Sequence, residues 1–296
     1  MTADPGAAWT IMELLCWTTS YFHHKGISEP RASAEVLLAH CLGRGRLALY
    51  LQHDQPLSTA ELANFKELIR RRLAGEPTQY ITGHQEFWSL DFLVNPAVLI
   101  PRPETEILID TVLKQVQQPD FPLAQGPLLD LGTGSGVLAI VLARELPVAR
   151  FVALDLSAAA LAVAQENARR HQVVERIGFI RGDLFQPLAP RPTFSVIISN
   201  PPYVPTREWQ HLPREIRHYE PRAALDGGPD GLAVIRRLVS EAHQYLIPGG
   251  LLALEVGQGQ ASAVLDLLLQ QGAYAPAETR YDYQKIQRVV FARRLE

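Results

Sequence analysis

Residues 194–203 constrain the fold more than any other part of the chain. The apolar run Val196-Ile197-Ile198 is typical of a strand buried in a parallel sheet, and it stops at Asn200-Pro201-Pro202-Tyr203. Because proline lacks the N–H that a central strand donates, the chain must leave the sheet here. Open α/β sheets bind ligands at this carboxyl edge. An amide side chain, rigid backbone carbonyls and an aromatic ring at that edge can grip a planar amide or amino group.

Strands and helices alternate around this stretch, which predicts a doubly wound α/β sheet. The expected strands are residues 128–131, 151–154, 177–180, 194–199, 251–256, 278–283 and 288–292. A helix is expected at 137–145, and Ser157 is expected to cap the next one. Residues 204–230 form a long irregular stretch, and loops of that length are usually functional or disordered.

A small helical bundle is expected to precede the sheet. In residues 1–75, Ser28 can cap a helix that has Pro30 in its first turn, and Ser58 with Glu61 makes a capping box. Residues 76–100 are interpreted as a β-hairpin linker, and residues 101–296 as the sheet domain.

Two segments have more than one interpretation. The run Arg70-Arg71-Arg72 is either the solvated last turn of a helix or a contact for an acidic partner. The stretch Pro101-Arg102-Pro103-Glu104-Thr105-Glu106 is either a plain helix start or a lid over a ligand.

Charge and composition narrow the functional class. The net charge of −3 over 296 residues gives no general attraction to nucleic acid. Cys16 and Cys41 are too few for a disulfide framework, and we expect free thiols in a reducing cytoplasm. No signal-peptide pattern and no apolar run long enough to span a bilayer is present in the sequence. We therefore expect a cytoplasmic protein without a membrane partner.

A glycine turn follows the first strand of the sheet, with the spacing Asp130-x-Gly132-x-Gly134-x-Gly136. This differs from the G-x-G-x-x-G of dinucleotide sites, which disfavours a nicotinamide dehydrogenase. Asp130 could receive a cationic amine, Asp155 ribose hydroxyls, and Asp183 an adenine amino group. Each aspartate alone could be a helix cap or loop residue. Four consecutive strand ends with suitable groups favour a ligand site.

Together these residues resemble the S-adenosylmethionine-dependent methyltransferase fold, and Asn200–Tyr203 resembles the motif of enzymes that methylate planar nitrogens. Nearly the whole chain is similar to the peptide-chain release factor N5-glutamine methyltransferases. The motifs that carry this resemblance are residues 77–83, Phe87-Trp88, residues 99–106, residues 130–136, Asn200–Tyr203 and residues 219–225. Pro-Arg-Pro-Glu-Thr-Glu beside a helical domain is the most discriminating of them.

The resemblance implies a Rossmann-like sheet of seven strands, mostly parallel with a C-terminal antiparallel strand, and an N-terminal domain that recognises substrate. It implies S-adenosyl-L-methionine as cofactor, S-adenosyl-L-homocysteine as product, and no metal. The cofactor-binding residues it implies are Asp130, Gly132, Thr133, Gly134, Ser135, Gly136, Asp155, Asp183, Leu184 and Asn200. Leu184 stands where the family often has an aromatic residue, so the adenine would pack on an aliphatic surface.

The implied substrate is the glutamine of the Gly-Gly-Gln motif in bacterial-type release factors. Asn200, Pro201 and Tyr203 are the expected catalytic residues, and Pro202 joins them in binding substrate. The Asn200 side-chain oxygen and the Pro201 carbonyl would accept the two amide N–H bonds, and Tyr203 would pack on the amide plane. We expect a monomer that does not bind nucleic acid directly. Two alternatives remain: a methyltransferase of exocyclic amines in DNA or RNA, and a non-enzymatic binding module.

Overall fold

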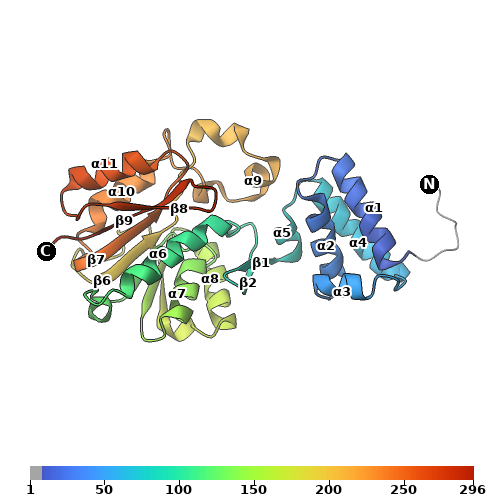
Figure 1. The fold of residues 1–296 in the computed structure, drawn as a ribbon, viewed down its shortest axis with the longest axis horizontal. Helices are drawn as coiled ribbons and strands as arrows, with labels where there is room; N and C mark the ends of the chain where they lie inside the picture. The colour runs from blue at the N-terminus through green and yellow to red at the C-terminus, as the bar shows by residue number, and fades with distance from the viewer. Residues whose placement is uncertain (1–8) are drawn as a thin grey trace. The chain divides into compact units, whose positions relative to one another are not determined.

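The N-terminal bundle follows from the helical periodicity of its apolar residues. The computed structural model describes residues 9–296, so residues 1–8 of the expected first domain lie outside the described part. The helices are α1 (Ile11–His24), α2 (Pro30–Cys41), α3 (Arg46–Leu51), α4 (Thr59–Leu73) and α5 (Thr78–Thr82) (Figure 1). Their apolar faces share one core, which includes Leu15, Phe22, Leu37, Leu38, Phe65 and Ile69.

The helical unit differs in extent from residues 1–75. The described part of the chain divides into one unit of residues 9–83 with 214–219, and a second unit of 84–213 with 220–296. Residues 78–82 form α5 instead of a strand because Ile81 is buried in the helical core. The expected hairpin is present but shorter, as β1 (His84–Phe87) and β2 (Leu90–Leu93).

The second unit contains a seven-stranded sheet, as expected. Its strands are β3 (Leu128–Leu131), β4 (Phe151–Asp155), β5 (Ile177–Arg181), β6 (Phe194–Ser199), β7 (Leu246–Glu255), β8 (Glu278–Tyr281) and β9 (Gln287–Arg293). Their order is β5-β4-β3-β6-β7-β9-β8. The five strands β3 to β7 pair in parallel, and β9 lies antiparallel between β7 and β8. The order changes direction between β3 and β6, where doubly wound sheets place their ligands.

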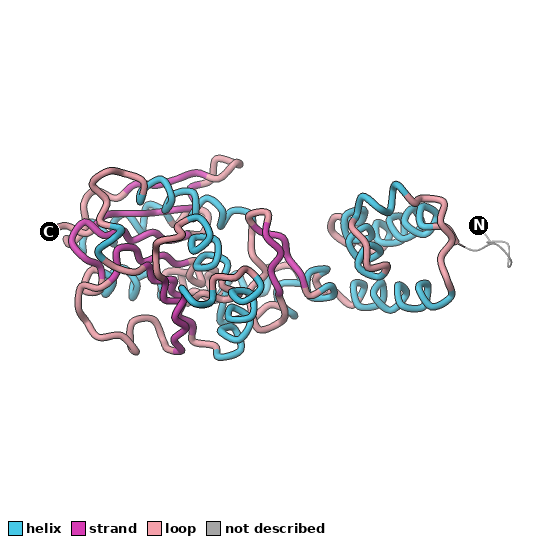
Figure 2. The backbone as a smooth tube through the Cα atoms, turned by 90° about the horizontal axis from the view of Figure 1, so that it is seen from below, coloured by secondary structure: helices cyan, strands magenta, loops and turns pink. Residues whose placement is uncertain are grey.

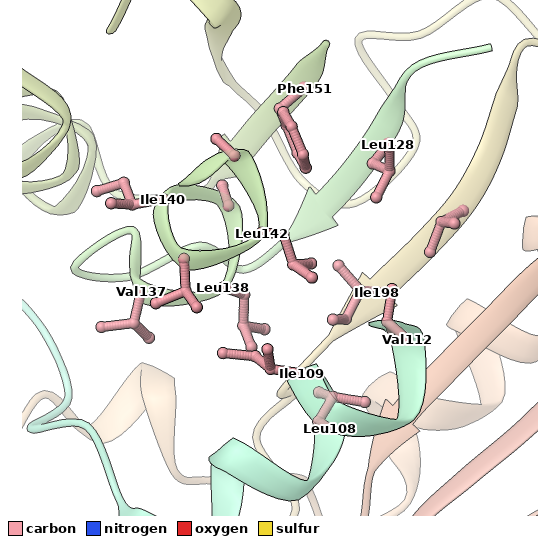
Figure 3. Packing of buried hydrophobic residues seen from close by; sticks show 14 of the residues in the cluster. Leu108, Ile109, Val112, Leu128, Val137, Leu138, Ile140, Leu142, Phe151 and Ile198 are labelled. Atoms are coloured by element: carbon pink, nitrogen blue, oxygen red, sulfur yellow. The ribbon is translucent and has the colours of Figure 1, made fainter. Parts of the chain in front are cut away.

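Helices cover both faces of this sheet (Figures 1 and 2). One face carries α6 (Glu106–Val116), α7 (Val137–Glu145) and α8 (Ala158–Arg170), and the other carries α10 (Ala233–Ala242) and α11 (Ala261–Gln271). Alternate residues of each strand face opposite layers, so Ile198 packs with the first set and Ile197 with the second. Figure 3 shows the first layer, where Leu108, Val112 and Leu142 pack beside Ile198.

The connections include short helices. These are η1 (Pro103–Thr105), η2 (Leu123–Gln125), η3 (Val174–Arg176), η4 (Thr206–His211), α9 (Arg214–Tyr219) and η5 (Arg222–Ala224). The stretch expected to be irregular, 204–230, therefore holds three of them. No helix within residues 9–296 is long and apolar enough to cross a membrane.

Candidate active site

The strand register places the glycine turn beside the Asn-Pro-Pro-Tyr corner. Asp130 on β3 pairs with Ile198 on β6. Gly132 comes two residues after Asp130, and Asn200 comes two residues after Ile198, so both leave the sheet at the same level. The buried Ser199 hydroxyl donates a 2.6 Å hydrogen bond to the Leu131 carbonyl and ties the two strand ends together. The two motifs that the sequence singled out therefore share one edge of the sheet.

The glycine turn offers open backbone on one side. Gly132 and Gly134 have φ values of +75° and +55°, which L side chains rarely adopt, and a Cβ at either position would meet no atom within 4 Å. A Cβ at Gly136 would instead lie 2.9 Å from Ile140 Cδ1. The first two glycines thus leave room for a ligand to approach the backbone, while the third permits close packing of α7.

Asp155, at the end of β4, supports this turn. Its Oδ2 accepts from the Gly134 N–H at 2.9 Å, and its Oδ1 accepts from the Ser157 N–H at 2.8 Å. Ser157 in turn caps α8 through the Ala160 N–H. The Asp155 side chain is half-buried, and its remaining lone pairs can still accept hydroxyl groups.

Asp130 lies beneath the turn and is 1% exposed. Its Oδ2 accepts from the Thr133 hydroxyl at 2.6 Å and from the Ala139 N–H at 3.2 Å. Its Oδ1 is buried without a hydrogen-bond partner among residues 9–296. Burial raises the pKa of this carboxyl group to about 7. Thr133 and Ser135 are also buried, and the Ser135 carbonyl accepts from Asn167 Nδ2 at 2.9 Å.

Asp183, which follows β5, already has hydrogen-bond partners within the chain, which the sequence did not suggest. Asp183 Oδ2 forms an ion pair with Arg237 at 2.9 Å and also accepts from Gln186 Nε2 at 3.3 Å. Leu184 follows with φ of +47°, an uncommon conformation for a branched side chain. Leu184 packs at the edge of the second apolar layer.

The Asn-Pro-Pro-Tyr corner is held from behind by a polar chain. Asn200 Nδ2 donates to the Thr105 hydroxyl at 3.1 Å, and Thr105 donates to Glu255 Oε2 at 2.7 Å. The Tyr203 hydroxyl donates to Glu255 Oε1 at 3.2 Å. Pro201 is buried and Pro202 is half-buried. Burial raises the pKa of Tyr203, with the Glu255 charge as a further cause, so its hydroxyl stays protonated.

Thr105 and Glu255 were not predicted as site residues. Both are buried, and burial raises the pKa of Glu255 to about 7. Glu255 follows Leu254, which pairs with Ser199, so the β6–β7 register places it beside Asn200. A carboxylate at the end of an otherwise apolar strand was the available signal for Glu255. Thr105 lay within the Pro-Arg-Pro-Glu-Thr-Glu motif but had no assigned role.

The Pro-Arg-Pro-Glu-Thr-Glu motif starts a helix, which was one of its two interpretations. It also contacts the Asn-Pro-Pro-Tyr corner through Thr105. Glu104 and Thr105 lie in η1, and Glu106 begins α6, where its carboxylate accepts from the Trp88 N–H at 3.0 Å. Arg102 pairs at 2.5 Å with Glu220, whose carboxylate also accepts from the Ile100 N–H. These bonds join the motif at residues 99–106 to the motif at residues 219–225, far apart in the sequence.

The arginines of the basic run form ion pairs with carboxylates of the same unit. Arg70 pairs with Glu67, Arg71 with Glu76, and Arg72 with Glu215 of α9. Of the two interpretations, the last turn of a helix is confirmed, since all three arginines lie in the last turn of α4, although Arg72 is buried there instead of solvated. Over the described part of the chain, no group of three His, Cys, Asp or Glu side chains is arranged to hold a metal ion.

The sheet order, the glycine turn and the Asn-Pro-Pro-Tyr corner define a methyltransferase. Residues 103–215 match the family model "Methyltransferase small domain", and residues 13–83 match "PrmC N-terminal domain". A methyltransferase from Pyrococcus furiosus has a similar fold, with a TM-score of 0.52 and 17% identity over 79% of this chain and all of that one. The hMettl16 catalytic domain gives a TM-score of 0.55 with 14% identity, covering 76% of this chain and 81% of that one.

Full-length relatives identify the family. The release factor glutamine methyltransferase of Geobacter sulfurreducens is 44% identical over 99% of both chains. That of Moorella thermoacetica is 45% identical over 92% of this chain and 94% of its own. The chain belongs to the release factor glutamine methyltransferase family, as its motifs predicted.

Proposed function

We propose that this protein transfers a methyl group from S-adenosyl-L-methionine to the side-chain amide nitrogen of the glutamine in the Gly-Gly-Gln motif of bacterial-type release factors. The register that sets Asn200 beside Gly132 carries this proposal. It supports the proposal because the Asn-Pro-Pro-Tyr corner, our proposed site for the planar amide, lies next to a glycine turn with open space beside it. The names of relatives that match over nearly the full chain support the release factor as substrate.

The glycine turn and its neighbours fit the cofactor. The cofactor-binding residues that we propose are Gly132, Thr133, Gly134, Ser135, Gly136, Asp155, Asp183, Leu184, Asn200 and Asp130. The open space at Gly132 and Gly134 supports close backbone approach, and the free lone pairs of Asp155 suit ribose hydroxyls. Asp130 holds the turn through Thr133, and we assign its unpartnered Oδ1 to the cofactor's amine. When bound, the cofactor supplies a methyl group activated by a sulfonium charge.

The chain's own contribution is to hold and aim the amide. An amide nitrogen is a poor nucleophile because its lone pair is delocalised into the carbonyl. Acceptance of its two N–H bonds by Asn200 Oδ1 and the Pro201 carbonyl would fix the nitrogen, and these oxygens would stabilise positive charge that develops on it. The Tyr203 ring would pack on the amide plane, and Pro202 would keep the corner rigid. As the N–CH₃ bond forms and the S–CH₃ bond breaks, the nitrogen becomes cationic and strongly acidic, so it can release one proton to water, and we assign no residue as general base.

We propose that the helical unit recognises the release factor. Helices α1 and α3 expose large apolar side chains, with Trp17 at 47%, Leu47 at 71% and Leu51 at 73% exposure. Single exposed apolar residues are common on any surface, but contiguous apolar patches mark protein contacts, and these side chains are our candidates for one. Replacement Leu51→Asp should raise KM for the release factor and leave kcat unchanged. An unchanged KM would remove Leu51 from the contact.

The remaining assignments are a cytoplasmic location, a monomeric state and the absence of a metal. A role in translation termination, which the relatives' names indicate, supports the location. Methylation of DNA or RNA amines is the rival activity, and the net charge of −3 disfavours it.

The test is a methylation assay with labelled cofactor and purified release factor. Label should enter the release factor and not a variant whose Gly-Gly-Gln glutamine is replaced. Asn200→Ala should nearly abolish the reaction while cofactor binding persists with reduced affinity. Near-normal turnover of Asn200→Ala would exclude Asn200 from the mechanism, and labelling of nucleic acid alone would favour the rival activity.

A further inference from the structure

The side of Asn200 that faces away from the proposed substrate contacts a chain of buried hydroxyl and carboxyl groups. Asn200 Nδ2 lies 3.1 Å from Thr105 Oγ1, and Thr105 Oγ1 lies 2.7 Å from Glu255 Oε2. Thr105 is 2% exposed and Glu255 is 1% exposed. Neither residue belongs to the glycine turn or to the Asn-Pro-Pro-Tyr corner. Thr105 contacts the Asn200 amide directly, and Glu255 contacts it through Thr105.

We propose that Thr105 and Glu255 are positioning residues that determine which end of the Asn200 carboxamide faces the substrate. The proposal rests on the role of Asn200 proposed above. A threonine hydroxyl has a single proton, and Thr105 donates that proton to Glu255. Thr105 can then only accept, so the Asn200 amide must turn its NH₂ group toward it. Asn200 Oδ1 is left facing away from Thr105, where it can accept an N–H from the glutamine amide.

The direction of this chain depends on the charge of Glu255. An ionised carboxylate only accepts hydrogen bonds, whereas a neutral carboxyl group can donate one. If Glu255 were neutral, it could donate to Thr105, and Thr105 could donate to Asn200 Oδ1. The amide would then flip and present NH₂ to the substrate's own NH₂, and two donors would face each other.

The groups around Glu255 set the pH at which this reversal occurs. The pKa of Glu255 is raised to about 7. Burial is the largest cause, and the charge of Glu104 acts in the same direction, whereas hydrogen bonds from Thr105 and Tyr203 and the charge of Arg288 act against them. The carboxylate form that orients Asn200 correctly is therefore lost as pH falls through about 7. We expect kcat to decline in the same range.

A set of valine, serine and glutamine variants tests the proposal. Thr105→Val keeps the shape of the side chain but removes the hydroxyl that links Glu255 to Asn200, a link that we call the relay. This variant should lower kcat about 10- to 100-fold, because misplaced reacting groups slow the reaction. KM for the release factor and the Kd of the cofactor, measured by calorimetry, should stay within about twofold of wild type. Thr105→Ser restores the hydroxyl and should recover most of kcat.

Thr111→Val is the matched control. Thr111 is also 2% exposed, and its hydroxyl donates at 2.7 Å to the Ile107 carbonyl of its own helix, α6. Its replacement should leave kcat unchanged. Thr105→Val with wild-type kcat would overturn the proposal. An equal loss in Thr111→Val, or no recovery in Thr105→Ser, would also overturn it, because the effect would then reflect packing alone.

Glu255→Gln tests the direction of the chain. A glutamine does not titrate, so the decline of kcat below pH 7 should be absent in this variant, whatever its activity at higher pH. A decline that persists unchanged in Glu255→Gln would overturn the assignment of Glu255. Asn200→Ala is assayed in parallel. Normal turnover in that variant would reject the proposed site itself, whereas its inactivity beside a fully active Thr105→Val would reject only the relay.

Discussion

Asp130 and Ile198 face each other across β3 and β6, and this single pairing brings Gly132 level with Asn200. The glycine turn and the Asn-Pro-Pro-Tyr corner lie 64 or more residues apart in sequence, as the interval from Gly136 to Asn200 shows. The relative position of the two motifs therefore depends on the register of two strands, which the buried hydrogen bond from Ser199 to Leu131 reinforces.

The glycines of the turn should respond differently to alanine. Gly134→Ala places a Cβ in open space at φ +55°, at a cost of about 1–2 kcal/mol in backbone strain, and should chiefly weaken cofactor binding. Gly136→Ala forces a Cβ to within 2.9 Å of Ile140 Cδ1 and should lower the melting temperature more. Calorimetry and thermal unfolding of both variants measure this. Equal losses of stability would contradict the distinction.

Replacement Asp155→Asn should weaken cofactor binding. An amide has one oxygen, so its NH₂ would face either the Gly134 N–H or the Ser157 N–H, both of which are donors. Loss of hydrogen bonds to a charged group predicts a Kd raised about 10- to 100-fold. Asp230→Asn is the matched control, because Asp230 accepts from the Leu232 N–H in the same two-residue turn. A similar rise in Kd for both variants would remove Asp155 from the cofactor site.

Asp130 should make stability fall with rising pH. Its pKa is raised from 3.8 to about 7 in the folded chain, so between these values the folded state holds a proton that the unfolded state has released. The free energy of unfolding should then fall by up to about 1.4 kcal/mol per pH unit from this group. The side chain at this position in the variant Asp130→Asn cannot ionise. The free energy of unfolding, measured with urea, should therefore depend less steeply on pH between pH 5 and 7 in this variant. Identical slopes would contradict the burial effect.

Loss of Glu215 should release α9 from the helical unit. Arg72 is 5% exposed at its side chain and pairs at 2.8 Å with Glu215. Glu215→Gln leaves the buried guanidinium without a counter-charge and should cost about 3 kcal/mol. Hydrogen exchange of residues 214–219 should accelerate. Glu67→Gln, which removes the exposed partner of Arg70 in the same basic run, should cost much less, because solvent screens an exposed pair. Comparable costs would show that the Arg72 pair is not special.

Local sequence patterns predicted most elements of the sheet unit. The helix 137–145 is confirmed in its bounds, and the capping box of Ser58 and Glu61 is present. Both depend on residues within a few positions of each other, so short-range propensity suffices. The shared edge of the glycine turn and the Asn-Pro-Pro-Tyr corner was predictable because parallel strands present their carboxyl ends together.

Features that depend on distant contacts were missed. The predicted cap at Ser28 was wrong: Glu29 precedes α2 in a left-handed conformation, and Ser28 Oγ instead lies 3.4 Å from Glu215. β7 begins at Leu246, earlier than residue 251, because Leu246 pairs with Phe194 across an irregularity in β6. Thr105 and Glu255 meet across 150 sequence positions. No local pattern specifies such a pairing.

The assignment of α9 to the helical unit has a consequence for how the protein is made. Residues 1–83 leave the ribosome first, but the carboxylate that neutralises Arg72 arrives only when residue 215 has been synthesised. During vectorial synthesis β3 to β6 emerge before Glu215 can pair with Arg72. A fragment that ends at Gly83 lacks this pair and should be less stable than the helical unit of the complete chain.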